Sequence, residues 1–355
     1  MSSARADRVL ERMRERELGA LLVTSLVNVR WLTGFTGTNG ACVLTPDDRL
    51  FLTDFRYVEQ AAGQVEGFEI VRTGRDLLGE LAARLPRGRA GFDDAHVTVR
   101  AHARLAERAG TGVELIAAGG LVEHLREVKD ASERARIAAA AELATTVFEQ
   151  ELVRGVVGRS ERGFALDLEH ALRLAGAEEP SFPSIVAHGA HAALPHAEPR
   201  DVEIPPGLLL TVDWGARLDG YCSDCTRTVA TGEVGERERT IYELVLGAQE
   251  AALVAVAPGA ACGAVDGVAR AIIEEAGEGE RFGHGLGHGV GLEVHEGPRL
   301  AKGAEGSLAA GNVVTIEPGL YLPGELGVRI EDLVVVEESG PRVLTRFPKA
   351  LTVVG

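Results

Sequence analysis

The sequence predicts two domains, a mixed α/β domain followed by an α+β domain built around two acidic β-hairpins. A chain of 355 residues exceeds the usual length of one domain. Strand-like and helix-like segments alternate through the first part of the chain, which is typical of a mixed α/β domain of about 125 residues. Further along, two apolar runs are each interrupted by a turn sequence, and each carries two acids.

Composition excludes several classes of protein. Hydrophobic residues make up 45% of the chain, which is ample for packed cores. The formal charge of −16 argues against nucleic acid or an anionic membrane as a partner, because both require a basic surface. No basic segment followed by an apolar one opens the chain, and no apolar run approaches the ~20 residues that span a bilayer. We therefore expect a soluble, cytoplasmic protein.

The first domain, expected over residues 1–128, is predicted from alternating patterns. A Gly-rich stretch at 28–45 leads into a further strand, and the strand at 49–54 is expected to form an antiparallel pair with it. This region contains neither a phosphate-binding Gly loop nor a nucleophile elbow, so we interpret Asp54, Arg56 and Trp31 as structural. The other predicted strands are 20–25, 68–73, 89–94 and 113–119, and the predicted helices are 3–18, 55–65, 75–85 and 97–110.

The second domain, expected over residues 129–355, begins where the composition changes to Ala, Glu and Arg. A long helix is predicted from about Ser132, and Ser160 is a candidate N-cap for the next helix. A strand and loop follow in the segment that contains His188, His191 and His196. Two more helices are expected near 236–257 and 263–276.

Residues 208–230 predict the first acidic hairpin. Asp219-Gly220 separates two apolar runs, and this dipeptide is the strongest short-range signal for a hairpin. With these two residues in the turn, Asp213 lies opposite Thr226 and shares a face of the ladder with Asp224. Two carboxylates on one face of an apolar hairpin repel each other unless cations lie between them. The hairpin therefore predicts half of a metal site.

Residues 312–336 predict a second acidic hairpin. Pro323-Gly324-Glu325 is a plausible three-residue loop, and counting outward from Gly324 places Glu317 opposite Glu331, with a slip of one residue allowed. Four carboxylates with a nearby imidazole and no thiolate favour hard or borderline divalent ions, namely Mn²⁺, Co²⁺, Fe²⁺ or Zn²⁺.

Glycine alternates with other residues from Gly283 to Gly291, and this run supplies the imidazoles. The spacing is not the G-x-G-x-x-G fingerprint, so a dinucleotide site is rejected. His284 and His288 lie between the glycines, which leave room for a substrate or metal near the backbone, and His295 follows. Histidines in this setting, near two acidic hairpins, are better explained by a site than by a structural role.

The four cysteines do not predict a disulfide framework in a chain of this length. Cys222 and Cys225 form a Cys-x-x-Cys motif, which invites a zinc or redox interpretation. The motif has no second pair and lies in a predicted strand, with the two side chains on opposite faces. We therefore interpret Cys222 and Cys225 as ordinary strand residues.

Taken together, the motifs WGARLDGYCSDCTRT, GHGLGHGVGLEVHE, TIEPGLY and GVRIED resemble those of the dinuclear pita-bread metallopeptidases. The N-terminal stretches VNVRWLTGFTGT and LTDFRYVEQA also resemble those of the Xaa-Pro peptidases, prolidase and aminopeptidase P. The resemblance covers nearly the whole chain. It implies a creatinase-like α/β domain followed by a pita-bread catalytic domain, with two divalent ions, most simply Mn²⁺, held by five ligands. These ligands are Asp213, Asp224, His288, Glu317 and Glu331.

The resemblance also implies roles for individual residues. Asp213 would bind one ion, His288 and Glu317 the other, and Asp224 and Glu331 would bridge them. A hydroxide between the ions would attack the carbonyl carbon before proline, with Glu317 handling the proton of the attacking water. His295 would stabilise the oxyanion and His196 would act near the scissile nitrogen or the leaving proline. The implied substrate-binding residues are His284, Arg299 and Arg329, the last supporting a bridging carboxylate.

The implied function is hydrolysis of the Xaa-Pro bond in proline-containing peptides, by a homodimer as in many relatives. Arg299 suits the free carboxylate of a dipeptide, which favours a dipeptidase. Aminopeptidase P, which acts on longer peptides, remains the main alternative. Methionine aminopeptidases lack so long an N-terminal domain, and creatinase-like enzymes do not need the acidic ligands. A binding protein without catalysis would have lost ligands, and none is lost here.

Overall fold

The computed structural model describes residues 2–355, which divide into two compact units at 126/127. The N-terminal unit contains a six-stranded sheet in the order β4-β3-β2-β1-β5-β6. Its central pair, β1 and β2, is antiparallel, whereas β5 runs parallel to β1. The strands are β1 (Ala20–Val23), β2 (Ala41–Leu44), β3 (Arg49–Asp54), β4 (Glu69–Thr73), β5 (Gly88–Phe92) and β6 (Val113–Ala117).

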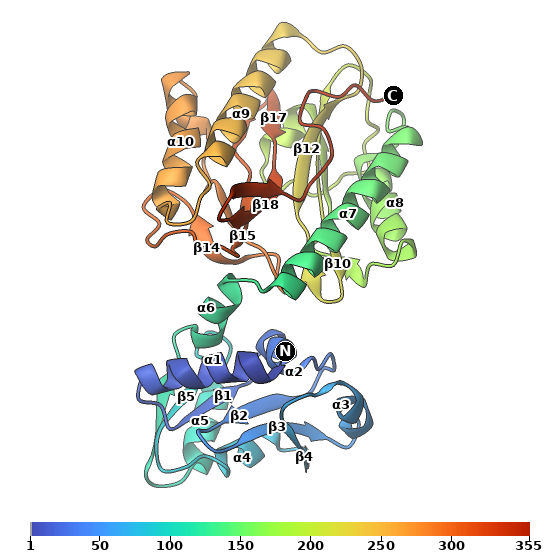
Figure 1. Ribbon diagram of the computed structural model, residues 1–355. Helices are drawn as coiled ribbons and strands as arrows, with labels where there is room; N and C mark the ends of the chain where they lie inside the picture. Colours follow the sequence, from blue (N-terminus) through green and yellow to red (C-terminus); the bar gives the residue numbers. More distant parts are fainter. Residues whose placement is uncertain (1) are drawn as a thin grey trace. The chain divides into compact units, whose positions relative to one another are not determined.

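Helices cover this sheet, and Figure 1 shows α1 and α4 on different sides of it. Buried side chains of α4 and α5, such as Leu81 and Leu105, form one core with Leu22, Val43 and Leu52 of the sheet. The mixed α/β prediction for this region is confirmed. The helices are α1 (Ser2–Glu15), α2 (Leu26–Thr33), α3 (Val58–Gln64), α4 (Leu77–Ala82), α5 (Val99–Arg108) and α6 (Leu121–Glu127).

Helix α2 corrects the sequence analysis, which treated its residues as an irregular Gly-rich stretch. The helix ends at Gly34, whose φ of 83° provides the left-handed C-cap that glycine adopts without strain. Trp31 is buried, and this burial stabilises a helix whose own propensity is weak. Asp54 and Arg56 form an ion pair with each other, at 2.6 Å between Arg56 Nη2 and Asp54 Oδ2.

The C-terminal unit has two large hydrophobic cores, each between a helix pair and strands. Figure 1 shows α7 and α8 on one side of the strands and α9 and α10 on the other. One core joins α7 and α8 to β8, β9 and β12, and the other joins α9 and α10 to β15, β16, β17 and β18. The helices are α7 (Ala131–Val153), α8 (Glu161–Leu174), α9 (Glu236–Val254) and α10 (Cys262–Glu275), with short 3-10 helices η1 (Gly189–Ala193) and η2 (Gly279–Arg281).

The strands of this unit form four small sheets, ordered β11-β10-β7, β12-β9-β8, β14-β13-β15-β18-β19 and β16-β17. Ser160 accepts a hydrogen bond from the Gly163 N–H, as predicted for the N-cap of α8. The strands are β7 (Glu179–Pro180), β8 (Ile185–His188), β9 (Leu209–Trp214), β10 (Ala216–Leu218), β11 (Tyr221–Cys222), β12 (Cys225–Ala230), β13 (Gly287–Gly289), β14 (Glu296–Leu300), β15 (Val313–Ile316), β16 (Gly319–Leu322), β17 (Leu326–Arg329), β18 (Asp332–Glu337) and β19 (Gly340–Val343).

Both predicted hairpins form in the predicted register. Leu218 pairs with Tyr221 and Asp213 with Thr226, around a turn in which Asp219 and Gly220 both have positive φ, 50° and 83°. Such a turn matches the right-handed twist of the flanking strands. In the second hairpin Leu322 pairs with Leu326, so no slip of register occurs.

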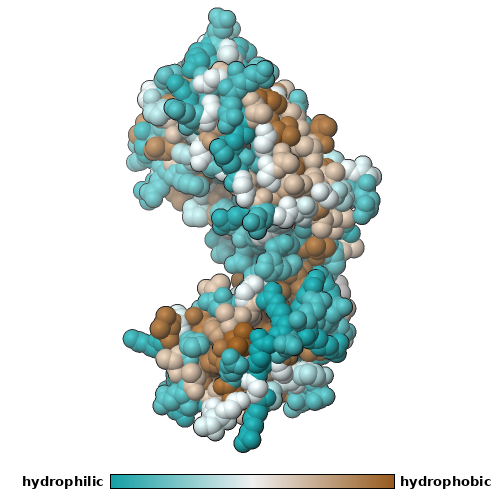
Figure 2. Space-filling view, turned by 90° about the vertical axis from the view of Figure 1, so that its left-hand side faces the viewer, coloured by the Kyte–Doolittle hydropathy of each residue, from teal (hydrophilic) through white to brown (hydrophobic). Residues whose placement is uncertain are grey.

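The surface of the protein is mixed in character. Figure 2 shows brown, hydrophobic residues interspersed among hydrophilic ones on the visible face of each unit. Large apolar side chains are exposed at separate places, among them Phe55 in the first unit and Leu166 and Leu174 on α8. Across residues 2–355, no helix is both long and apolar enough to cross a bilayer.

Candidate metal centre

Three carboxylates converge between the two hairpins. Asp213 comes from β9, Asp224 from the interruption between β11 and β12, and Glu331 from the residue before β18. One ligand atom of each lies within 4.8 Å of the others. The first hairpin brings its two acids together because residues opposite and diagonal on one face are neighbours. Glu331 joins them because its backbone N–H bonds the carbonyl of Thr226, at 3.1 Å.

The other two predicted ligands lie beside this cluster. His288 Nε2 lies 3.3 Å from Glu317 Oε1 and 3.7 Å from Asp224 Oδ2. His288 belongs to the short strand β13, and Glu317 follows the last residue of β15. Thr315 donates a hydrogen bond to Glu317 Oε1 at 3.0 Å and accepts one from the His288 N–H at 3.1 Å. The structure thus brings all five predicted ligands into one buried region.

The electrostatics of these groups depend on burial and on their neighbours. Burial and the charges of the neighbouring carboxylates raise the pKa of Asp224 and of Glu331 well above the usual range. Burial also raises the pKa of Asp213, although Arg329 opposes the shift. Burial has the same tendency for Glu317, but the hydrogen bond and charge of His288 prevail and lower its pKa. Such a cluster stays ionised only if further positive charge enters it.

The donor set fits divalent metal ions. Asp213 Oδ1 and Glu331 Oε1 are buried and have no hydrogen-bond partner among residues 2–355. A buried polar atom without a partner costs free energy, and two carboxylate oxygens in this state point to a cation as the missing partner. Carboxylate oxygens with one imidazole suit Mn²⁺, Co²⁺, Fe²⁺ and Zn²⁺. The residues that would hold such ions are Asp213, Asp224, His288, Glu317 and Glu331.

Arg329 is connected differently from the sequence-based expectation. We expected it to support a bridging carboxylate, but its Nη2 lies 2.7 Å from Asp213 Oδ2. Its Nε donates to Thr226 Oγ1 at 3.0 Å, and Nη1 donates to Tyr321 Oη at 2.9 Å and to the carbonyl of Pro195 at 3.1 Å. Each guanidinium nitrogen of Arg329 therefore has a protein partner. Its contact with substrate remains a prediction.

His284 forms part of the same network. Its Nε2 is 2.8 Å from Tyr321 Oη and its Nδ1 is 2.7 Å from the carbonyl of Gly285. Tyr321 Oη already accepts from Arg329, so its proton points to His284 Nε2, and Nδ1 carries the imidazole proton. Burial lowers the pKa of His284, which keeps the ring neutral. Both ring nitrogens are occupied, so a substrate would meet the carbon edge or face of this ring.

The remaining predicted residues surround the metal ligands. The ring of His295 lies with its centroid 4.3 Å from that of His288. Arg299 pairs with His288 across β13 and β14, so both side chains lie on one face of the ladder. His196 lies in an exposed turn after η1. Burial, and after it the charge of His288, lower the pKa of His295. Arg299 forms no ion pair within residues 2–355.

Sequence reasoning missed three residues that organise the site. Thr226 donates to Glu331 Oε2 at 2.7 Å and accepts from Arg329. Tyr321 joins Arg329 to His284, and Thr315 joins His288 to Glu317. The predicted register placed Thr226 opposite Asp213, and this signal could have identified it. Nothing in the sequence alone pointed to Tyr321 or Thr315.

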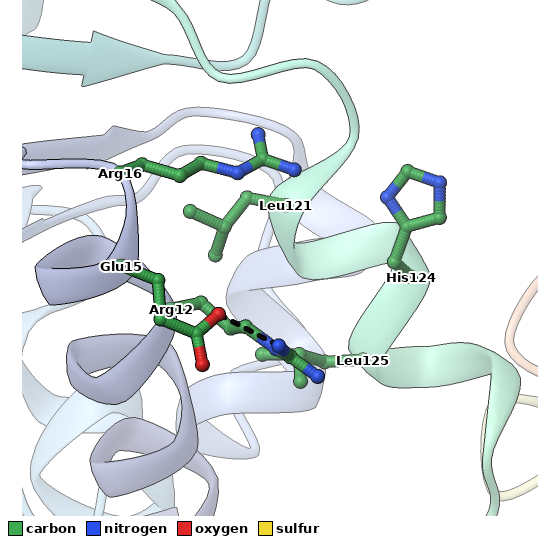
Figure 3. A pocket seen from close by; sticks show the side chains of 6 residues that line it. All are labelled: Arg12, Glu15, Arg16, Leu121, His124 and Leu125. Carbon is green, nitrogen blue, oxygen red and sulfur yellow. Dashed lines mark hydrogen bonds and ion pairs between the residues drawn. The ribbon is translucent and has the colours of Figure 1, made fainter.

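A pocket in the N-terminal unit does not compete with this centre. It has a cavity volume of about 240 Å³. Figure 3 shows Arg12 and Glu15 paired with each other while His124 points away from them. Arg12 Nη1 lies 2.7 Å from Glu15 Oε2, so these two charges already form an ion pair. The lining residues are Arg12, Glu15, Arg16, Leu121, His124 and Leu125.

Comparisons with known proteins identify the family of the chain. The model of metallopeptidase family M24 matches residues 123–338, and that of the creatinase/prolidase N-terminal domain matches residues 5–128. A curated relative, the uncharacterized peptidase YqhT of Bacillus subtilis, is 40% identical over 95% of this chain and 96% of its own.

Two solved structures are similar over nearly the whole length. The Xaa-Pro dipeptidase from Bacillus anthracis is 37% identical, with a TM-score of 0.96, over 99% of this chain and 100% of that chain. The X-Pro aminopeptidase from Thermotoga maritima is 35% identical, with a TM-score of 0.89, over 96% of this chain and 99% of that chain.

The chain belongs to metallopeptidase family M24. It is a peptidase with an N-terminal creatinase-like domain and a C-terminal pita-bread domain, and its family implies divalent metal ions. The fold class and the enzyme class predicted from the sequence are confirmed.

Proposed function

We propose that the protein is an Xaa-Pro dipeptidase that uses two divalent metal ions. The observation that supports this most directly is the convergence of the five predicted ligands from separate segments, in which two buried carboxylate oxygens have no hydrogen-bond partner among residues 2–355. Asp224 lies within reach of Asp213 and Glu331 on one side and of His288 on the other. This position suits a carboxylate shared by two ions. Similarity to an Xaa-Pro dipeptidase supports the substrate class.

In this proposal Asp213 would bind one ion, and His288 and Glu317 would bind the other. Asp224 and Glu331 would bind both. When bound, the ions would polarise the scissile carbonyl and lower the pKa of water so that it is ionised near neutral pH. Manganese is the ion we propose first, because the donor set contains no thiolate and has mainly oxygen ligands.

The chain's own residues would position the substrate and move protons. Glu317 is ionised, because the hydrogen bond and charge of His288 lower its pKa despite burial. In this proposal its carboxylate would handle the proton of the attacking water. His295 would donate a hydrogen bond to the carbonyl oxygen as negative charge develops on it. His196 would act beside the scissile nitrogen or the leaving proline. Tyr321 is buried beside His284, 2.8 Å from its Nε2, and would help to exclude water from this part of the site.

Arg299 supports a preference for dipeptides. Its side chain lies on the face that carries His288 and has no ion-pair partner within residues 2–355. A dipeptide ends in a carboxylate immediately after proline, and a guanidinium can bind a carboxylate through two hydrogen bonds. We therefore propose that Arg299 anchors the C-terminal carboxylate of an Xaa-Pro dipeptide.

An aminopeptidase P that acts on longer peptides is the second candidate. The chain is about as similar to an X-Pro aminopeptidase as to the Xaa-Pro dipeptidase, and the shared fold does not distinguish the two activities. In that case the space beside Arg299 must remain open so that the peptide can continue beyond proline. The two candidate functions therefore differ in whether Arg299 binds the free carboxylate of the substrate.

The test compares kcat/KM for Ala-Pro and Ala-Pro-Ala, with Mn²⁺, in the wild type and in Arg299→Ala. The dipeptidase proposal expects the wild type to prefer Ala-Pro, and the variant to lose about 10- to 100-fold on Ala-Pro alone. Arg346→Ala is the matched control, because Arg346 is an exposed arginine that contacts Glu142. Equal or better cleavage of Ala-Pro-Ala by the wild type would establish the aminopeptidase instead.

The proposal also covers the domain bounds, the oligomeric state, the location and the metal of the enzyme. We propose that residues 1–128 and 129–355 are its two domains. We propose a homodimer, which light scattering of the purified protein would test. We propose a cytoplasmic location, supported by four cysteines that form no disulfide. Metal analysis of protein purified without added metal would test the proposed manganese.

A further inference from the structure

A fully buried carboxylate lies outside the proposed metal ligands, at the first residue of α8. Glu161 has no exposed surface. An ionised carboxylate in such a position requires strong compensation, because removing its hydration costs several kcal/mol. The first turn of a helix favours negative charge but contributes only about 0.3–1 kcal/mol. Other groups must therefore hold the charge of Glu161.

These groups all come from one segment, residues 188–200. Arg200 donates to Glu161 through its backbone N–H at 3.0 Å, through Nε at 2.9 Å and through Nη2 at 3.0 Å. His188 donates its backbone N–H at 3.0 Å, and its Nδ1 lies 2.8 Å from the carboxylate. His191 Nδ1 lies 3.1 Å from Oε2.

The charge of Glu161 agrees with these contacts. Burial opposes ionisation, but the donors from Arg200 and His188 prevail and lower the pKa of Glu161 to about 2. Because one carboxylate contacts residues 188 and 191 at the beginning of the segment and residue 200 at its end, it fixes the path of the chain between them. That path contains His196.

The opposite side of the segment is fixed by the second hairpin. Arg329 donates to the carbonyl of Pro195, the residue before His196. A Cβ atom at Gly327 would lie 1.8 Å from the carbonyl oxygen of Ala192, so β17 approaches η1 as closely as only glycine permits. His196 itself is exposed, and its side chain forms no hydrogen bond or ion pair within residues 2–355. Its position therefore depends on the backbone that carries it.

We propose that Glu161 is a positioning residue that acts through His196, holding residues 188–200 so that the imidazole meets the substrate. The inference rests on the proposed function, which gives His196 its contact with the scissile nitrogen or the leaving proline. Glu161 does not touch the substrate. A displacement of about 1 Å in a group that acts on the substrate can cost about 100-fold in rate.

A double-mutant cycle tests this coupling. Glu161→Gln retains the shape of the side chain and removes its charge, and it is measured alone and together with His196→Ala. Alone it should lower kcat/KM by about 10- to 100-fold, but in the His196→Ala background by less than about 3-fold. Equal losses in both backgrounds would overturn the proposal, because Glu161 would then act by another route.

Glu151→Gln is the matched control. Glu151 is also a buried carboxylate on a helix, with a side-chain exposure of 2%, and it is held by Arg154 and Arg159. This variant should lose stability but retain kcat/KM within about 3-fold. A loss of activity as large as that of Glu161→Gln would show that general destabilisation explains both.

Hydrogen–deuterium exchange provides a readout that does not depend on peptidase activity. Glu161→Gln should increase exchange within residues 188–200, whereas Glu151→Gln should not. If the increase occurs but no Xaa-Pro peptide is cleaved by the wild type, the proposed function fails while the positioning of the segment stands.

If Glu161→Gln does not fold, Arg200→Ala replaces it in the same cycle. Its side chain is 43% exposed and therefore easier to remove. Unchanged exchange in this segment in the folded variant would overturn the proposal.

Discussion

Two arginine–aspartate pairs join the acidic hairpins, and they differ in how completely they are satisfied. Arg329 of the second hairpin pairs with Asp213 of the first. Arg227 of the first hairpin pairs with Asp332 of the second, at 2.8 Å between Nη2 and Oδ1. Each hairpin thus contributes one arginine and one aspartate to the two pairs. Both pairs are largely buried.

The carboxylate of Asp332 has a full set of partners. Its Oδ1 also accepts from Thr345, and its Oδ2 accepts from Gln249 and Lys349, each at 2.8–3.0 Å. Although burial opposes it, Arg227 and Lys349 lower the pKa of Asp332. Asp213, in contrast, has one oxygen without a partner among residues 2–355 and a raised pKa. The carboxylate of Asp332 completes the core, whereas Asp213 keeps one buried oxygen without a protein partner among residues 2–355, as suits a cation ligand.

The largest expected effect follows from removing metal, or a metal ligand, from the proposed centre around Asp213 and Asp224. A chelator should abolish hydrolysis, and Mn²⁺ or Co²⁺ should restore it. Asp224→Asn removes a charge that both ions would share, so turnover should fall by about 100-fold or more, with weaker Mn²⁺ binding by calorimetry. The metal-free variant should be at least as stable as the wild type, because an amide avoids the cost of keeping a carboxylate buried beside Glu331. Full activity in demonstrably metal-free protein would refute the metal mechanism.

Removing the charge of Asp332 from its pair with Arg227 should instead reduce the stability of the fold. Asp332→Asn leaves Arg227 buried with less compensation, and we expect a loss of about 3 kcal/mol in the free energy of unfolding. Urea unfolding of the metal-free chain measures this loss. Mn²⁺ affinity should change far less than in Asp224→Asn. A variant with wild-type stability but no metal binding would show that the two pairs have the same role, and the comparison would fail.

The sequence predicted the parts of the site that depend on local register. Asp219-Gly220 fixed the first turn, and the alternation of side chains then placed Asp213 and Asp224 on one face. The second turn likewise determined the positions of Glu317 and Glu331. These are short-range geometric consequences, which one strand period and one turn suffice to determine.

Contacts between distant segments could not be predicted in the same way. The spacing of Arg329 and Glu331 suggested a contact between them, yet the guanidinium reaches Asp213 of the other hairpin. The role of Glu161 depends on the path of residues 188–200, which no local pattern determines. Helix α2 was missed because the burial of Trp31 by distant residues outweighs a weak local preference.

A buried aspartate of the N-terminal unit, Asp93, extends the comparison to a carboxylate that forms no ion pair within residues 2–355. Burial raises the pKa of Asp93 to about 6, despite hydrogen bonds from the N–H groups of Thr24 and Ser25. Its folded-state pKa exceeds the unfolded value, so its contribution to stability is fully present at low pH and is lost as the pH rises through about 6.

Asp93→Asn should therefore gain stability relative to the wild type as the pH rises. The gain between pH 4 and pH 7.5 should be about 2–3 kcal/mol, from the size of the pKa shift. Urea unfolding of both proteins at each pH, followed by tryptophan fluorescence, measures it. A difference that is independent of pH would mean that Asp93 titrates normally.

The smallest expected effect concerns Cys222 and Cys225, which lie in the same hairpin as Asp213 and Asp224. Burial raises the pKa of both thiols, so neither is a ready thiolate ligand. Their polar contacts differ, since Cys222 Sγ lies 3.9 Å from the carbonyl of Leu292, whereas Cys225 Sγ lies 3.5 Å from Arg227 Nη1 and 3.8 Å from the carbonyl of Glu331. The metal-ligand cluster found within residues 2–355 includes neither.

Replacing Cys222 and Cys225 together by Ala should leave kcat within about 3-fold of the wild type. It should also lower the free energy of unfolding by about 1–2 kcal/mol, because two buried sulfur atoms are lost. Metal analysis of the variant checks the interpretation directly. Loss of one metal ion per chain would show that the thiols bind metal. An unchanged metal content with nearly unchanged turnover would limit the metal centre to oxygen and imidazole ligands.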